Sequence, residues 1–158
     1  MKALYLLSFF LIAELAVAQQ IHIQEDFNTS TIPNGWSVNP VSGTQNWQFG
    51  LDGSSGQNGN NNIDGTSMSY FDDDDLGSTS TNNTASLISP NFDNSSFNRT
   101  ILKFDYNFRS ASVGDSLYVE VFDGTQWNIV FSRTQDSCGN WLSCNFFPTE
   151  SIDIVIAI

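Results

Sequence analysis

Four consecutive aspartates lie in the stretch YFDDDDLG, at Asp72, Asp73, Asp74 and Asp75. Calcium takes roughly six to eight oxygen ligands, from carboxylates, amides and main-chain carbonyls. In an extended segment neighbouring side chains point to opposite sides, so only one or two of the four are expected to share an ion. Repulsion between the carboxylates favours a bound cation. A charge run is also typical of a solvated turn, and the sequence leaves both interpretations open.

Residues for catalysis are not arranged in a recognisable pattern. His22 is the single histidine, which leaves no zinc site and no Ser-His-Asp triad. No Gly-x-Ser-x-Gly motif marks a nucleophilic serine. No acid lies on an apolar patch that would raise its pKa beside a second, ionised acid, as a glycosidase requires. The sequence therefore predicts a protein that binds and does not catalyse.

Two sets of side chains are candidates for ligand contact. The first is the polar side of the stretch TILKFDYNFR, where Lys103, Asp105, Asn107 and Arg109 alternate with apolar residues. The second is Trp141, which we expect to be partly exposed as a surface for stacking on a sugar. Most tryptophans in small β-sandwiches belong to the core, and we expect Trp36 and Trp127 to be buried.

The composition indicates export and an acidic surface. Residues 1–18, MKALYLLSFFLIAELAVA, have the features of a secretory signal peptide: Lys2, an apolar stretch too short to cross a bilayer, and Ala16-Val17-Ala18 as the cleavage site. The formal net charge of −12 argues against nucleic acid and anionic lipid as partners. No other stretch is long and apolar enough to insert into a membrane. We therefore expect a secreted, extracellular or cell-surface protein.

Cys138 and Cys144 enclose the short stretch GNWLS. In an exported protein two nearby cysteines are expected to form a local disulfide. A metal site is disfavoured because no second cysteine pair and one histidine are present.

The mature chain shows no amphipathic helix. Short apolar or alternating runs separated by Gly, Asn, Ser and Asp predict strands near 21–27, 35–38, 46–49, 67–71, 85–89, 100–108, 116–122, 126–132 and 151–158. His22 is expected on the exposed side of the first of them. Leu117, Val119 and Val121 should share one face, and Asp123-Gly124 predicts a hairpin turn. These features predict an all-β fold, a two-sheet antiparallel β-sandwich formed by residues 19–158.

The order of the motifs carries a resemblance. EDFNTSTIPNGW, NWQF, IDGTSMSYF, ASLISP, ILKFDYNFRSASVGDSLYV and a hairpin with a tryptophan follow one another at domain-like spacing. This order resembles the MAM-like jelly roll in its bacterial form, the cleaved-adhesin and choice-of-anchor J modules of secreted surface proteins. The resemblance covers residues 23–158. Because SIDIVIAI ends in mid-strand, we expect one or more further strands beyond residue 158.

The resemblance implies structural calcium in a second place. The acidic-aromatic opening of the family matches Glu25-Asp26-Phe27, with Asn28 where the family has another acid, and its Asp-x-Thr matches Asp64-Gly65-Thr66. Glu25, Asp26, Asn28 and Asp64 are thus the family-matched calcium ligands. The alternative is that Asp26 and Asn28 cap a turn through local bonds to the main chain.

The resemblance also implies a function. Its members are commonly non-catalytic adhesion or accessory modules of larger secreted proteins. We expect an extracellular binding module, stabilised by calcium, whose partner is an extracellular protein or a glycan. The alternatives are an accessory domain of a secreted protease or glycoside hydrolase, and a carbohydrate-binding module.

Overall fold

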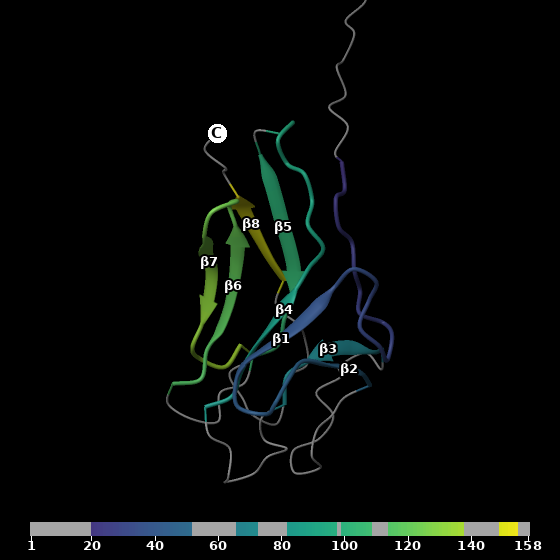
Figure 1. Ribbon diagram of the computed structural model, residues 1–158, viewed down its shortest axis with the longest axis vertical. Coiled ribbons are helices and arrows are strands. Elements are labelled where there is room, and N and C mark those ends of the chain that lie inside the picture. Colours follow the sequence, from purple (N-terminus) through teal and green to yellow (C-terminus); the bar gives the residue numbers. More distant parts are fainter. Residues whose placement is uncertain are drawn as a thin grey trace, which may run out of the picture.

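The protein is built from strands. The computed structural model describes residues 20–51, 66–72, 82–97, 99–108, 114–137 and 149–154, and this part of the chain contains no helix. Every strand pairs with an antiparallel neighbour, as Figure 1 shows. The strands are β1 (Ser37–Ser42), β2 (Gln48–Gly50), β3 (Met68–Tyr70), β4 (Thr84–Ile88), β5 (Thr100–Asp105), β6 (Leu117–Phe122), β7 (Trp127–Arg133) and β8 (Thr149–Ile154).

The strands form four two-stranded antiparallel sheets, β1-β4, β2-β3, β5-β8 and β6-β7. A short loop from Asp123 to Gln126 joins β6 to its sheet partner β7, and in it the Asp123 N–H donates to the Gln126 carbonyl over 3.1 Å. Gly124 in that loop has φ +97°, a conformation that glycine adopts without strain. The hairpin turn predicted at Asp123-Gly124 is therefore confirmed. The all-β, antiparallel prediction is confirmed as well, and the arrangement has the character of a β-sandwich.

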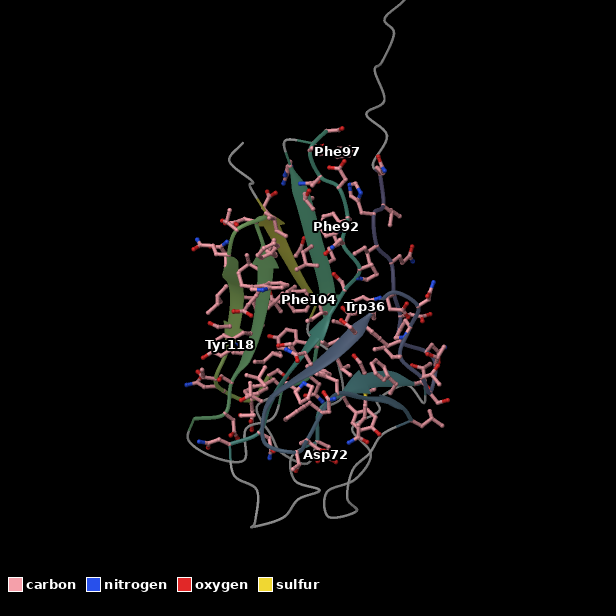
Figure 2. The ribbon with its side chains drawn as sticks, in the orientation of Figure 1. Trp36, Asp72, Phe92, Phe97, Phe104 and Tyr118 are labelled. Atoms are coloured by element: carbon pink, nitrogen blue, oxygen red, sulfur yellow. The ribbon has the colours of Figure 1, made fainter. Side chains whose placement is uncertain are left out.

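The hairpin packs against β5 through aromatic rings. The ring of Phe131 in β7 lies 5.3 Å from that of Phe104 and 5.1 Å from that of Tyr106, centroid to centroid. Both contacts are edge-to-face, the geometry that aromatic pairs prefer. Tyr106, directly after β5, and Ile154, at the end of β8, are the most buried apolar side chains in the described part of the chain. Figure 2 shows Phe104 of β5 on the side of this strand that faces the hairpin.

The alternation predicted for β5 and β6 is confirmed. In β5, Leu102 and Phe104 are half-buried whereas Ile101, Lys103 and Asp105 are exposed. In β6 the positions Leu117, Val119 and Val121 are half-buried and the residues between them are exposed. Period-two alternation of this kind places one face of each strand on the core.

The strand predicted over residues 21–27 is wrong. No strand is formed there, because side chains bind the main chain locally. The Phe27 N–H donates to Glu25 Oε1 over 2.9 Å, and the Asn28 N–H donates to Asp26 Oδ1 over 3.0 Å. Phe27 adopts φ +53°, which an extended strand does not allow. Such local bonds compete with a sheet ladder.

The N-terminal segment is held by aromatic contacts instead. The ring of Phe27 packs edge-on against Trp36 at 4.8 Å. His22 is half-buried, with its ring 5.4 Å from Phe92 and 5.1 Å from Phe97. The expectation that His22 lies on the exposed face of a strand is therefore wrong. Trp36, expected to be buried, is half-buried.

Candidate functional site

The acidic residues at the opening of the chain act as turn caps. Glu25 and Asp26 each accept a main-chain N–H two residues further on. Asn28 accepts the Ser67 N–H through its side-chain oxygen over 3.2 Å, so this turn is fastened to the segment that leads into β3. Each carboxylate has a second oxygen that these bonds do not use. Asp64, the fourth family-matched position, lies outside the described residues.

The aspartate run is described only at its first member. The main-chain carbonyl of Asp72 accepts a hydrogen bond from Gln45 Nε2, which ties the end of the β3 segment to the segment before β2. Asp73, Asp74 and Asp75 lie outside the described residues. Within the part of the chain that the structure describes, no three His, Cys, Asp or Glu side chains gather closely enough to hold a metal ion.

Of the four residues in the predicted polar stripe, Lys103 and Asp105 lie together on one exposed face. Lys103 and Asp105 lie on the exposed face of β5, opposite Ser151 and Thr149 of β8. The Thr149 hydroxyl bonds to the Asp105 carboxylate, so polar groups of the two strands satisfy each other on this face.

Asn107 lies beyond the end of β5 and is half-buried. Its side-chain oxygen accepts the Ser137 hydroxyl over 3.2 Å, and the same hydroxyl accepts the Phe108 N–H over 3.0 Å. Asn107 therefore fastens the segment after β7 to the segment after β5. The remaining predicted positions, Arg109, Trp141 and the cysteines Cys138 and Cys144, lie outside the described residues.

Among the described residues, the outer face of the β6–β7 hairpin carries the largest group of exposed apolar side chains on one sheet. Tyr118, Phe122, Trp127 and Ile129 have exposed fractions of 51, 49, 53 and 58%. Phe122 and Trp127 are register partners with ring centroids 5.3 Å apart. Glu120 lies opposite Ile129, and Tyr118 opposite Ser132. We call these residues, Tyr118, Glu120, Phe122, Trp127 and Ile129, the hairpin face.

A β-bulge in β7 creates this face. The register runs regularly from Leu117–Arg133 to Val119–Phe131, then shifts so that Glu120 pairs with Ile129, which leaves Val130 as the extra residue. Because side chains alternate along a strand, one inserted residue puts the side chains before it and after it out of phase, so that Ile129 and Phe131 point to opposite faces. Phe131 therefore points to the core while Trp127 and Ile129 point to the outer face. The expectation that Trp127 is buried is wrong for this reason.

The end of the hairpin is stiffened by a network around Asp123. Asp123 Oδ1 accepts the Thr125 N–H over 2.8 Å, the Gln126 N–H over 2.9 Å and the Thr125 hydroxyl over 2.7 Å. Asp123 Oδ2 accepts Asn128 Nδ2 over 2.8 Å. These bonds to the charged form hold the pKa of Asp123 far below its usual range, the main-chain bond from Gln126 most strongly. These hydrogen bonds thereby fix the tip that positions Phe122 and Trp127.

The sequence contained a partial signal for the hairpin face. The alternation of DSLYVEVF places Tyr118, Glu120 and Phe122 on the side opposite the apolar core positions, and the structure confirms it. The sequence of β7 did not indicate that Trp127 and Ile129 point to the outer face. Their direction depends on the bulge, which exists only in the pairing of β7 with β6.

Comparison with known proteins adds no relative: no family model, no curated protein and no solved structure matches this chain. In the described residues, no helix is long and apolar enough to cross a membrane.

Proposed function

We propose that this chain is a secreted, non-catalytic binding module of a larger extracellular or cell-surface protein, with the hairpin face as its contact surface. The observation that carries the proposal is the exposure of two aromatic rings and an aliphatic side chain side by side on a rigid hairpin. Aromatic side chains with an apolar body and exposed faces are enriched where proteins bind partners. The partner class proposed here is an extracellular protein or a glycan.

The physical reasoning rests on the cost of exposing such groups. A regular, unbulged β7 would place Trp127 and Ile129 on the inner side with the other apolar positions of the hairpin. The observed register instead leaves their apolar surface in water. Burying that surface would lower the free energy by about 25 cal/mol for each Å² removed from water. Contiguous exposed apolar surface of this kind marks interaction sites.

The test is retention on purified ligands. The chain from residue 19 should be retained by at least one immobilised extracellular protein or insoluble glycan, and Trp127→Ala should abolish retention. Phe92→Ala is the matched control, because Phe92 is also exposed, at 41%, but packs beside His22, away from the hairpin in Figure 2. Retention that survives Trp127→Ala, or that Phe92→Ala reduces equally, would show that the hairpin face is not the contact surface.

Calcium belongs to the same proposal as a structural ion. The support is that Asn28 already fastens the N-terminal turn to Ser67, so an ion bound by Asp26 and its neighbours would reinforce a junction between segments distant in sequence. An ion that binds only the folded state stabilises it by about 2.7 kcal/mol at a hundredfold excess over Kd. Thermal unfolding with excess calcium and with a chelator should differ by several degrees.

The variants Asp26→Ala and Asp72→Ala assign the ion to one of the two acidic regions. Loss of the calcium effect in only one of them identifies the region that binds. An identical melting temperature with calcium and with chelator would reject the ion altogether.

A further inference from the structure

The charge on the hairpin face is negative. Glu120 lies on β6 between Tyr118 and Phe122, about 7 Å from each along the strand, and Asp123 follows at the tip. The described cations lie elsewhere: Arg99 pairs with Asp153, Lys103 is on the exposed side of β5, and Arg133 stands opposite half-buried Leu117. Among the described residues, then, exposed rings and carboxylates share this face with no compensating positive charge.

This combination has a specific chemical preference. The face of an aromatic ring carries partial negative charge and attracts ammonium and guanidinium groups, most strongly for tryptophan. A carboxylate at the same place adds direct pairing, and guanidinium groups can both stack on rings and bind carboxylates in a fork. Trp127 and Phe122, tilted by 46° to each other, offer two ring surfaces to one cationic side chain.

We propose that the hairpin face binds a cationic segment of a partner protein, in which arginine or lysine side chains stack on Trp127 and Phe122 and pair with Glu120. This inference rests on the proposed function of the chain as a binding module and names the chemistry of its partner. The charge of the chain also supports the inference. Its net charge of −12 is complementary to a cationic partner and would steer such a partner toward it.

A second copy of the chain fits this face less well. In a two-fold symmetric contact the same patch meets itself, so two Glu120 carboxylates would be enclosed with the apolar side chains. Like charges enclosed without partners are strongly unfavourable, and two chains of charge −12 repel each other. Anionic glycans and anionic lipid surfaces are disfavoured by the same charge.

The experiment uses the chain from residue 19 and two synthetic peptides of equal length. One peptide alternates arginine with glycine and serine, and the other has glutamine in place of every arginine. Binding is measured by calorimetry at low and at physiological salt. The arginine peptide should bind and the glutamine peptide should not. Trp127→Ala should weaken binding by about fivefold and Glu120→Gln by about threefold.

Two controls separate this site from general acidity. Asp93→Asn removes one negative charge next to Phe92, away from the hairpin, and should leave binding of the arginine peptide unchanged. Phe92→Ala should also leave it unchanged. Because Trp127 and Glu120 are exposed, both site variants should retain the wild-type melting temperature.

The results that overturn the inference are distinct from those that overturn the proposed function. Equal weakening by Asp93→Asn and Glu120→Gln would mean that net charge alone attracts the peptide, which rejects the cationic site. Retention of a neutral polysaccharide through Trp127, with no binding of the arginine peptide, would also reject it while leaving the binding module in place. Failure of every peptide, protein and glycan to bind the wild-type chain would reject both.

Discussion

Phe131 connects the hairpin to the rest of the described structure, and its removal is the most direct test of the fold. Its ring is in edge-to-face contact with Phe104 and Tyr106 of the β5 segment. Because of the bulge at Val130, this side chain faces the core while Ile129 and Trp127 in the same strand point outward. The change Phe131→Ala deletes the ring and leaves a cavity between the hairpin and β5.

The expected cost follows from the ring contacts. Replacing a core phenylalanine by alanine costs about 3–5 kcal/mol, and Phe131 is half-buried, so the lower end applies. Two aromatic pairs at about 0.5–1.5 kcal/mol each account for part of this value. We expect a loss of about 3 kcal/mol in the free energy of unfolding. For a chain of about 140 residues this corresponds to a decrease of roughly 10 °C in Tm.

The assay is urea unfolding of the chain from residue 19, followed by fluorescence and by far-ultraviolet circular dichroism. The midpoint should fall while the slope m stays the same. The control is Ile129→Ala, two residues away in the same strand but with an exposed fraction of 58% on the outer face. Its effect should stay within about 0.5 kcal/mol, as for other surface substitutions.

Equal effects of the two substitutions would refute the reasoning. So would a larger effect of Ile129→Ala, because it would mean that the outer face of β7 is the buried one. The bulged register assigned to the hairpin would then be wrong, and the proposals that rest on the exposure of Trp127 would fall with it.

Three further outcomes are expected. Gly43 has φ +76°, so Gly43→Ala should destabilise the protein by about 1–2 kcal/mol through backbone strain. The added Cβ would also collide with Asn83 Oδ1. An unchanged urea midpoint would contradict this prediction. Hydrogen bonds lower the pKa of Asp123 in the folded state, so the stability they contribute is complete above the unfolded pKa of about 4 and is lost as pH falls toward the folded value. The Tm difference between wild type and Asp123→Ala should therefore be constant at neutral pH and shrink in acid; a difference that grows in acid would contradict the assignment. The Arg99–Asp153 pair is exposed on both sides, so Arg99→Gln should leave Tm within about 2 °C of wild type at physiological salt, and a larger decrease would show that the pair holds β8 in place.

Local patterns in the sequence predicted most strands of the fold. Alternation placed β5 and β6 with the correct residues facing the core, and the Asp-Gly turn placed the hairpin. The failure at residues 21–27 has a physical cause that composition conceals. Glu25 and Asp26 are compatible with an exposed strand side, but their carboxylates bind the nearby N–H groups of Phe27 and Asn28 instead of leaving them for a ladder.

Prediction of the candidate site was less complete. The predicted calcium residues that the structure describes serve as turn caps or carry main-chain bonds, and calcium binding stays a prediction. The stripe on β5 was expected as a single surface, but Asn107 turns inward to Ser137. Sequence alone does not single out Tyr118, Phe122, Trp127 and Ile129, because single exposed apolar residues are common and only their spatial grouping makes them notable.

The sequence by itself determined that this chain is built from strands and which side of β5 and β6 is apolar, because both follow from period-two alternation between neighbouring residues. The tertiary structure decided which side of β7 faces the core. One extra residue, Val130, reverses the direction of every side chain before it in the strand. Its position depends on the pairing with β6 and on the rings of Phe104 and Tyr106 that receive Phe131, contacts between residues far apart in the chain.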